Sequence, residues 1–368
     1  MKNTTKRLLS ALLATTMLLA LTACGGSKAD DTKTEEPAPS TTTEAPAEQP
    51  ANDCKELSVY TAFPESEVIY YFNKFEEETG IKVNYVRLSA GEMLTRVEAE
   101  KDNPQATLMF GGSTDNYIAA VDKGLLEAYQ SPNLSNTPST YLDPTGTWNP
   151  IYVGCIAFAC NSDWFADKGL DYPTSWEDLL DPAYKGEIIM AHPATSGTAY
   201  TVLATLIQLM GEEKVWDYLA KLDVNMSQYT KSGSAAPNAV ALGEAAIALT
   251  FSHDALQLTP EGYHIELSFP TDGTGFEVGA MALIKGGKAE EQENAKLFID
   301  WMTSEAGQGC YAENDSFRVP TNTAAPVANG LVTLDQVPVI DYDAVWAASV
   351  KSGFCEQFEN KVAAKPEG

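Results

Sequence analysis

Strand-like and helix-like hydrophobic patterns alternate along most of the chain. Leu57–Ala62 is a short apolar run typical of a buried strand, and Glu65–Thr79 follows it with apolar residues at helical spacing from Val68 to Phe75. Gly80 is the residue type that commonly ends a helix. Further strands are predicted at Ile81–Leu88, Ala106–Phe110, Ile151–Cys160, Gly186–Ala191, Ala245–Phe251 and Gly275–Ile284, and further helices at Gly91–Glu100 and Glu290–Gly309. This alternation indicates an α/β protein whose parallel strands are joined by right-handed crossovers.

A proline- and asparagine-rich stretch, Gln130–Pro150, divides the pattern, and the alternation restarts after it. The chain has 368 residues, of which 44% are hydrophobic, which is enough for two domains with cores of ordinary size. We therefore expect two lobes, with the chain returning to the first near Gly273. The expected division is 54–150 and 273–317 for lobe 1, and 151–272 and 318–368 for lobe 2.

The beginning of the chain has the pattern of an export signal. Basic residues between Lys2 and Arg7 precede an apolar stretch, Leu8–Leu21, that is too short and too interrupted for a membrane span. The ending Leu21-Thr22-Ala23-Cys24 resembles the bacterial lipobox, in which the cysteine carries a lipid. The resemblance implies a lipoprotein signal peptide at 1–23 and lipidation of Cys24. An ordinary secretory peptide with an incidental cysteine is the alternative.

Residues 24–53 have the composition of a disordered tether. After the cysteine they are mostly Ser, Thr, Glu, Ala and Pro without an aromatic residue, and such a segment cannot bury enough apolar surface to fold. A lipid anchor followed by this linker would hold a soluble domain at the outer face of the cell membrane. A surface-anchored enzyme would need the same arrangement, so the anchor alone does not choose a function.

The charge of the chain excludes some partners. Lys and Arg number 24 against 51 Asp and Glu, and the formal net charge is −27. Nucleic acids and anionic lipid surfaces are repelled by such a field. We therefore expect no nucleic-acid partner.

Five cysteines remain after Cys24, an odd number that leaves at least one without an intrachain partner. Cys155 and Cys160 lie five residues apart in a predicted strand, which places them on opposite faces and argues against a bond between them. A bridge between Cys310 and Cys355 is plausible. No Cys-x-x-Cys pair or Cys/His cluster indicates a structural zinc site.

Small hydroxyl residues and glycine gather in the loops that follow the predicted strands. Ligands of open α/β sheets lie beyond the carboxyl ends of the strands, and several of these loops precede a helical pattern whose free N–H groups suit an anion. Ser196-Gly197-Thr198 is the best candidate for a phosphate, because the following helical segment, Ala199–Met210, is long and apolar. Helix caps and turns are the alternative for any one loop. The candidate ligand-binding residues of these loops are Thr61, Ser89, Gly112, Ser113, Ser196, Gly197, Thr198 and Ser232.

Several short motifs occur in an order that carries a family resemblance. They are Val59–Ala62, Pro104–Ala106, Gly111–Ser113, Trp176–Leu179, Ser196–Thr198, Ser232–Ser234, Gly243–Ile247 and Arg318–Pro320. Together, behind a lipobox, they resemble the extracellular solute-binding proteins of bacterial ABC importers, in the branch that includes ferric-iron, phosphonate and sugar-phosphate binders. The resemblance implies an α/β, two-lobed periplasmic-binding-protein type II fold, with a two-strand hinge and an interlobe ligand cleft.

The residues after the strand Ala245–Phe251 bear on the ligand. Iron-binding relatives carry a Tyr-Tyr pair here, and its absence removes the phenolates that hard ferric ion favours. His253 and Asp254 instead resemble the pattern of sugar-phosphate binders, in which a His-Asp pair and a later Glu bond ligand hydroxyls, and Glu277 fits the third position. A structural histidine and a helix cap are the alternatives for His253 and Asp254. Glu277 lies in an apolar strand, where a buried carboxylate needs a partner.

Arginine is scarce: only Arg87, Arg96 and Arg318 follow the leader. Each is a candidate contact for an anion, but surface ion pairs are the favoured interpretation.

No Gly-x-Ser-x-Gly, Walker or His-Glu-x-x-His motif indicates an enzyme. We expect an extracytoplasmic, lipid-anchored, monomeric binding protein without a cofactor. It would capture a small polar, anionic and hydroxylated solute, such as a sugar phosphate, and deliver it to an ABC permease. The alternative is a receptor for ferric iron or another metal, with His253, Asp254 and Glu277 as ligands.

Overall fold

The computed structural model describes residues 53–366. The predicted signal peptide, Cys24 and the linker up to residue 52 lie outside the described residues, so those interpretations stay predictions. The strands are β1 (Glu56–Thr61), β2 (Lys82–Arg87), β3 (Leu108–Ser113), β4 (Leu126–Glu127), β5 (Trp148–Asn161), β6 (Ile188–Ala191), β7 (Met226–Thr230), β8 (Ile247–Phe251), β9 (Ile265–Ser268), β10 (Phe276–Ile284) and β11 (Val319–Pro320). The helices are α1 (Glu65–Thr79), α2 (Ala90–Ala99), α3 (Thr114–Asp122), α4 (Ser162–Lys168), α5 (Gly197–Met210), α6 (Glu212–Asp223), α7 (Ala235–Ala241), α8 (Ser252–Leu256), α9 (Gln292–Thr303), α10 (Glu305–Glu313) and α11 (Ala344–Lys361).

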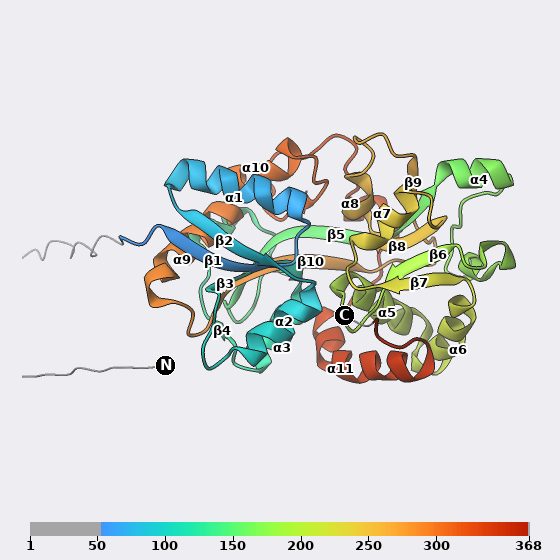
Figure 1. Ribbon diagram of the computed structural model, residues 1–368, viewed down its shortest axis with the longest axis horizontal. Coiled ribbons are helices and arrows are strands. Elements are labelled where there is room, and N and C mark those ends of the chain that lie inside the picture. The colour runs from blue at the N-terminus through green and yellow to red at the C-terminus, as the bar shows by residue number, and fades with distance from the viewer. Residues whose placement is uncertain (1–52, 367–368) are drawn as a thin grey trace, which may run out of the picture. The chain divides into compact units, whose positions relative to one another are not determined.

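The first lobe is built on three parallel strands in the order β2, β1, β3, with helices on both faces (Figure 1). Its apolar residues alternate across the sheet, as a strand requires. Val59 of β1 belongs to the core formed with α1, α9 and α10, whereas the neighbouring Tyr60 belongs to the core formed with α2 and α3. As predicted, α1 ends at Gly80, whose left-handed backbone (φ 70°) lets its N–H bond the carbonyl of Glu76.

Two long antiparallel strands, β5 and β10, pass between the lobes (Figure 1). The part of β5 at Trp148–Cys155 pairs with β10, and the part at Ile156–Cys160 pairs with β8 of the second lobe. Pro150 lies inside β5 beside the shift of register between Gly279 and Ala280, where a strand tolerates a residue without an N–H. These strands form the two-strand hinge that the family resemblance implies.

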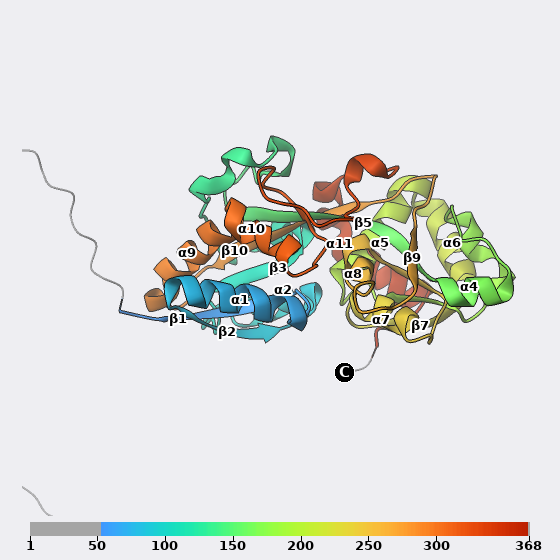
Figure 2. The same ribbon diagram turned by 90° about the horizontal axis from the view of Figure 1, so that it is seen from above.

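The second lobe repeats the architecture with parallel strands in the order β8, β6, β7. Helices α5 and α6 pack on one face together with the C-terminal helix α11, which contributes Ala347, Phe354 and Phe358 to that core. Helices α7 and α8 cover the other face. Figure 2, turned by 90°, shows α11 beside α5 in the second lobe, although α11 follows it by more than a hundred residues.

The structure corrects three details of the predicted elements. The sheet is mixed rather than parallel, because β5 and β10 run antiparallel to their neighbours. The predicted helix Glu290–Gly309 is two helices, since Ser304 ends α9 and its hydroxyl accepts the N–H of Gly307 to start α10. The strand expected to end at Phe110 continues to Ser113, which pairs with Gly279 of β10.

The suggested disulfide between Cys310 and Cys355 is wrong. Both are free thiols, and they belong to different cores: Cys310 lies in the first lobe with α1 and α9, and Cys355 lies in the second with α5 and α6. Cys155 and Cys160 are free and buried, in agreement with their predicted separation on β5.

The expected boundaries of the lobes, 54–150 with 273–317 for lobe 1 and 151–272 with 318–368 for lobe 2, stay a prediction. Across residues 53–366, no helix combines the length and the apolar character needed to traverse a lipid bilayer.

Candidate ligand site

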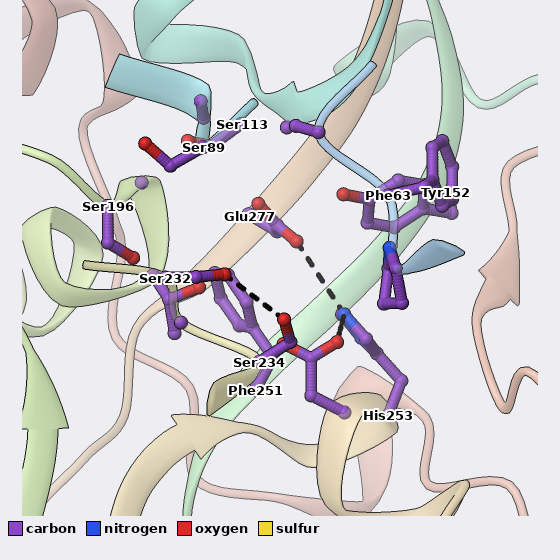
Figure 3. A pocket seen from close by; sticks show the side chains of 18 of the residues that line it. Phe63, Ser89, Ser113, Tyr152, Ser196, Ser232, Ser234, Phe251, His253 and Glu277 are labelled. Carbon is purple, nitrogen blue, oxygen red and sulfur yellow. Dashed lines mark hydrogen bonds and ion pairs between the residues drawn. The ribbon is translucent and has the colours of Figure 1, made fainter. Parts of the chain in front are cut away.

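A cavity lies between the lobes, where the carboxyl ends of the parallel strands of both sheets face each other (Figure 3). Every predicted ligand residue except Thr61 lines it: Ser89, Gly112, Ser113, Ser196, Gly197, Thr198, Ser232, His253, Asp254 and Glu277. Thr61 is buried behind the cavity, and its hydroxyl accepts the N–H of Phe63, which shapes the loop after β1. The sequence therefore predicted the location of the cavity, and the ligand-binding role of these residues stays a proposal.

One end of the cavity is formed by the starts of helices from both lobes. Ser89, Ser113 and Ser196 are the N-cap residues of α2, α3 and α5, and all of them line the cavity. The first N–H groups of α5 have no partners within the helix, as in any helix, and the hydroxyl of Ser196 accepts one of them, the N–H of Ala199. Each helix start carries a partial positive charge, so three of them favour an anion at this end.

The lobes touch each other beside these helix starts. The N–H of Gly91 in α2 donates to the carbonyl of Thr195 in the second lobe at 3.2 Å. Gly197 in α5 packs against the first lobe closely enough that a Cβ atom there would lie 2.7 Å from the hydroxyl oxygen of Ser113. Glycine at both positions allows this approach.

The other end of the cavity holds a buried arginine. The guanidinium of Arg318 donates from Nε and Nη2 to the two carboxylate oxygens of Glu67, at 2.8 and 2.7 Å. It packs against the rings of both Phe63 and Tyr152, with its central carbon 4.5 and 4.4 Å from their centroids. The ion pair and the two cation–π contacts fix the plane of this guanidinium.

Arg318 also sets the state of His253. Its Nη1 lies 2.8 Å from Nε2 of His253, and because a guanidinium can only donate, that nitrogen must accept. The ring proton is then on Nδ1, which is buried without a hydrogen-bond partner in the described chain. Burial, followed by the charge of Arg318, lowers the pKa of His253 well below its usual value. His253 is therefore neutral at neutral pH.

Two carboxyl groups of the cavity lie close to His253, and Figure 3 shows the one from Glu277 directed at the histidine ring. The nearest oxygens of Asp254 and Glu277 lie 3.6 and 3.8 Å from its Nε2. Burial raises the pKa of Glu277 to about 8, and it raises the pKa of Asp254 to about 6 even though the nearby Arg318 acts in the opposite direction. At neutral pH Glu277 is mostly protonated and can donate as well as accept, whereas Asp254 is mostly ionised.

The three arginines of the described chain have different surroundings, which could not be predicted from the small number of arginines. Arg96 forms the expected exposed ion pair, with Glu100. Arg318 is a correction: its side chain is only 3% exposed and it belongs to the cavity wall. Arg87 is half-buried and bonds hydroxyls of the second lobe rather than a carboxylate.

Other cavity residues were missed because their types suggest only packing. Phe63, Tyr152 and Phe251 line the cavity, and Phe251 stacks on His253 with ring centroids 5.3 Å apart. Ser234 was part of a recognised motif but was not proposed as a ligand residue, although it lies beside Ser232 at 3.1 Å. An apolar residue directly after a strand, at the same edge as the serine loops, is the signal that could have identified Phe63.

The cavity is narrow, with a volume of about 50 Å³. A larger cavity of about 660 Å³ adjoins it near the hinge and shares Ser113 and Glu277 with it. The walls of the larger cavity are mostly apolar and do not include Ser196 or Ser232 of the second lobe. The narrow cavity therefore holds the groups suited to a polar ligand.

The residues of this cavity are poorly suited to bind a metal ion. Among residues 53–366, no group of three or more His, Cys, Asp and Glu side chains is arranged to hold one. Nε2 of His253 is already occupied as an acceptor, and the guanidinium of Arg318 lies 3.6 Å from Asp254, where its positive charge opposes a second cation.

Comparisons with known proteins identify the family and the fold. The family model for bacterial extracellular solute-binding proteins matches residues 113–346. An uncharacterized protein of Haemophilus influenzae is 38% identical over 275 residues, which cover 73% of this chain and 79% of that relative. The solved periplasmic binding protein AfuA from Actinobacillus pleuropneumoniae, with fructose-6-phosphate bound, superposes with a TM-score of 0.80 and 34% identity and covers 83% of this chain and 98% of AfuA.

Iron-bound HitA from Pseudomonas aeruginosa superposes with a TM-score of 0.70 and 22% identity, over 82% of this chain and 98% of HitA, which supports the fold alone. The family match, the Haemophilus influenzae relative and AfuA show the family as well as the fold. This chain belongs to the bacterial extracellular solute-binding proteins and has their two-lobed, type II periplasmic-binding-protein fold.

Proposed function

We propose that this protein captures a small phosphorylated, hydroxyl-bearing solute, such as a sugar phosphate, and delivers it unchanged to an ABC permease. The observation that carries the proposal is the chemical difference between the two ends of one cavity. Three helix N-caps form one end, and His253, Asp254 and Glu277 form the other. A solute with an anionic group and several hydroxyls matches both ends at once.

The helix starts supply the affinity for the phosphoryl group. A single exposed helix start favours an anion by only ~0.3–1 kcal/mol, and by up to ~2 kcal/mol when it is partly buried. The N-caps Ser89, Ser113 and Ser196 are all at least 95% buried when the lobes are in contact. Their helices can therefore act together on one group, which a single helix could not hold tightly.

The carboxyl end suits hydroxyls. Asp254 accepts hydrogen bonds as a carboxylate, and Glu277, protonated at neutral pH, can both donate and accept. The charge-assisted hydrogen bonds that the ionised Asp254 accepts contribute about 1.5–3 kcal/mol each. The bound fructose-6-phosphate of AfuA supports a ligand of this class.

The small cavity implies motion of the lobes. Small-molecule sites typically measure about 300–1,000 Å³, whereas this cavity measures about 50 Å³. A hexose phosphate can enter only if the lobes separate around β5 and β10, and the lobes then close on it. A permease that prefers the ligand-closed form would then distinguish loaded from empty protein.

Titration calorimetry on protein purified without ligand tests the proposal. We expect binding of fructose 6-phosphate at micromolar affinity or better, and much weaker binding of fructose, which lacks the phosphoryl group. A ferric chelate, with the free chelator as control, tests the alternative. Binding of ferric ion without binding of any phosphate ester would replace the proposal by an iron receptor.

Two finer points belong to the same proposal. Binding without chemistry predicts that fructose 6-phosphate is recovered intact after long incubation, and released phosphate would contradict it. A lipid anchor at Cys24 predicts that cells grown with labelled palmitate yield labelled protein, and that Cys24→Ala abolishes the label. A soluble, unlabelled wild-type protein would rule the anchor out.

A further inference from the structure

Arg87 differs from the other arginines in the described part of the chain because it pairs with no carboxylate there. Arg96 lies 2.9 Å from Glu100, and Arg318 lies 2.7 Å from Glu67. In the described part of the chain, the hydrogen bonds of the Arg87 guanidinium all go to neutral oxygens. Its Nη2 donates to the hydroxyls of Ser232 and Ser234 at 2.7 and 3.2 Å, and its Nε donates to the carbonyl of Phe63 at 3.4 Å.

The position of Arg87 brings this charge, which forms no ion pair in the described chain, to the ligand cavity, where it acts to lower the pKa of the Asp254 carboxyl. Arg87 is the last residue of β2 in the first lobe, and Ser232 and Ser234 belong to the loop after β7 in the second. All of the residues it bonds line the cavity. The guanidinium is half-buried, so it is only partly stabilised by water.

Its present partners are replaceable. A guanidinium forms its strongest bonds with planar or tetrahedral oxyanions, to which it can donate from two nitrogens at once. Ser232 and Ser234 are rotatable hydroxyls that already lie 3.1 Å from each other. An oxyanion entering between the lobes could take the donors of Arg87 while both hydroxyls turn to donate to the same group.

We propose that Arg87 recognises the second negative charge of the phosphoryl group and so selects a phosphate ester over a singly charged or neutral analogue. This inference rests on the proposed function. The helix starts attract any oxyanion, whereas a full positive charge discriminates between one and two negative charges. A phosphate monoester has a second pKa of about 6 and is a dianion at pH 7.5, whereas a sulfate ester is a monoanion of nearly the same shape.

A different role would give a different signature. If Arg87 only latched the lobes through Ser232 and Ser234, its removal would weaken every ligand that needs closure by the same factor. Recognition of charge predicts unequal losses. The ratio of affinities for the two esters therefore separates the two roles.

The experiment is calorimetric titration at pH 7.5 of wild type, Arg87→Lys, Arg87→Gln and the control Arg96→Gln with fructose 6-phosphate and fructose 6-sulfate. Arg96 is a matched control because it is an arginine of the same lobe in an exposed ion pair away from the cavity. We expect Arg87→Gln to lower the affinity for the phosphate ester about 10–100-fold and to change the affinity for the sulfate ester by no more than about threefold. Arg87→Lys should fall between, and Arg96→Gln should match wild type.

Thermal unfolding of each variant shows whether the fold is intact, and the half-buried position of Arg87 predicts a small change. Equal losses for both esters, or phosphate binding by Arg87→Gln as strong as that of Arg96→Gln, would overturn the role of Arg87 and leave the proposed function standing. A wild-type protein that binds neither ester would overturn both.

Discussion

Arg318 and Glu67 form a bidentate ion pair between residues 251 positions apart, with both side chains at most 3% exposed. Removing one partner of a buried pair leaves an uncompensated charge, which typically costs about 3–5 kcal/mol. We expect Glu67→Gln to lower the free energy of unfolding by an amount in this range. Denaturant titration measures the change.

The matched control is Glu100→Gln, which removes the partner of Arg96 in a pair that is partly exposed. Exposed pairs contribute about 0–1 kcal/mol, so this variant should unfold almost like wild type. Similar losses in both variants would mean that the buried pair is not the stabilising feature described above.

The raised pKa of Glu277 predicts that stability falls as pH rises. In the unfolded chain this carboxyl ionises near its usual value of 4.5, whereas in the folded protein it keeps its proton up to about pH 8. Between these values the folded state binds more protons, so the free energy of unfolding decreases with pH by at most about 1.4 kcal/mol per unit from this group. Above pH 8 the contribution of Glu277 no longer changes.

Glu277→Gln should flatten that slope between about pH 5 and 8, as measured by thermal or denaturant unfolding at several pH values. Glu291 provides a control of opposite sign, because hydrogen bonds from Lys288, Thr107 and Ser58 outweigh burial and lower its pKa. Its stabilisation is constant above about pH 4.5 and is lost as the pH falls further, so Glu291→Gln should change the slope of stability against pH only below about pH 4.5. An unchanged slope in Glu277→Gln would show that this carboxyl titrates normally.

Ser196 is expected to act both as a helix cap and as part of the ligand site. Ser196→Ala removes the hydroxyl that accepts the N–H of Ala199, and loss of such a cap costs about 1 kcal/mol. Ser304→Ala removes an equivalent cap at the start of α10, away from the cavity. Both variants should lose similar stability, but only Ser196→Ala should bind fructose 6-phosphate more weakly. Equal binding by the two would limit Ser196 to a structural role.

Gly91 is expected to control closure of the lobes. A Cβ atom at this position would lie 2.9 Å from the carbonyl oxygen of Thr195, a main-chain atom of the other lobe that cannot rotate away. Gly91→Ala should therefore weaken ligand binding about tenfold or more, since overpacking costs about 1–3 kcal/mol. The open form escapes the contact, so the variant should stay folded.

Gly353→Ala is the control, because Gly353 also lies in a helix but a Cβ atom there would meet nothing within 4 Å. It should bind like wild type, and alanine should make α11 slightly more stable. Small-angle scattering with saturating ligand should show compaction in Gly353→Ala and less compaction in Gly91→Ala. Full compaction and full affinity in Gly91→Ala would contradict the closure argument.

Local pattern predicted the elements well where one signal dominated. The apolar face of α1 and the glycine after it identified that helix to the residue. The same reasoning failed at Ser304, because the apolar spacing continues on both sides of it and hides the break between α9 and α10. The alternation of strands and helices also predicted a parallel sheet. This was wrong because the pattern of a single strand does not show the direction of the strands beside it.

The cavity could be located from sequence because a rule of topology, and not residue identity, brings strand ends together. The chemical roles of the two ends of the cavity could not be predicted from the sequence. Glu67 lies in the first turn of α1 and Arg318 lies 251 positions later, and nothing local indicates that they meet. The neutral state of His253 follows from burial and from the charge of Arg318, whereas the protonation of Glu277 follows from burial, and only the folded chain determines both.

A crystal structure of the protein grown with fructose 6-phosphate tests the central claim most directly. The predicted result is a phosphoryl group within hydrogen-bond distance of the main-chain N–H groups of Gly197 and Thr198, with sugar hydroxyls against Asp254 and Glu277. Density for the sugar phosphate in the apolar cavity near the hinge, or with its phosphoryl group directed at Asp254 and Glu277, would contradict the account.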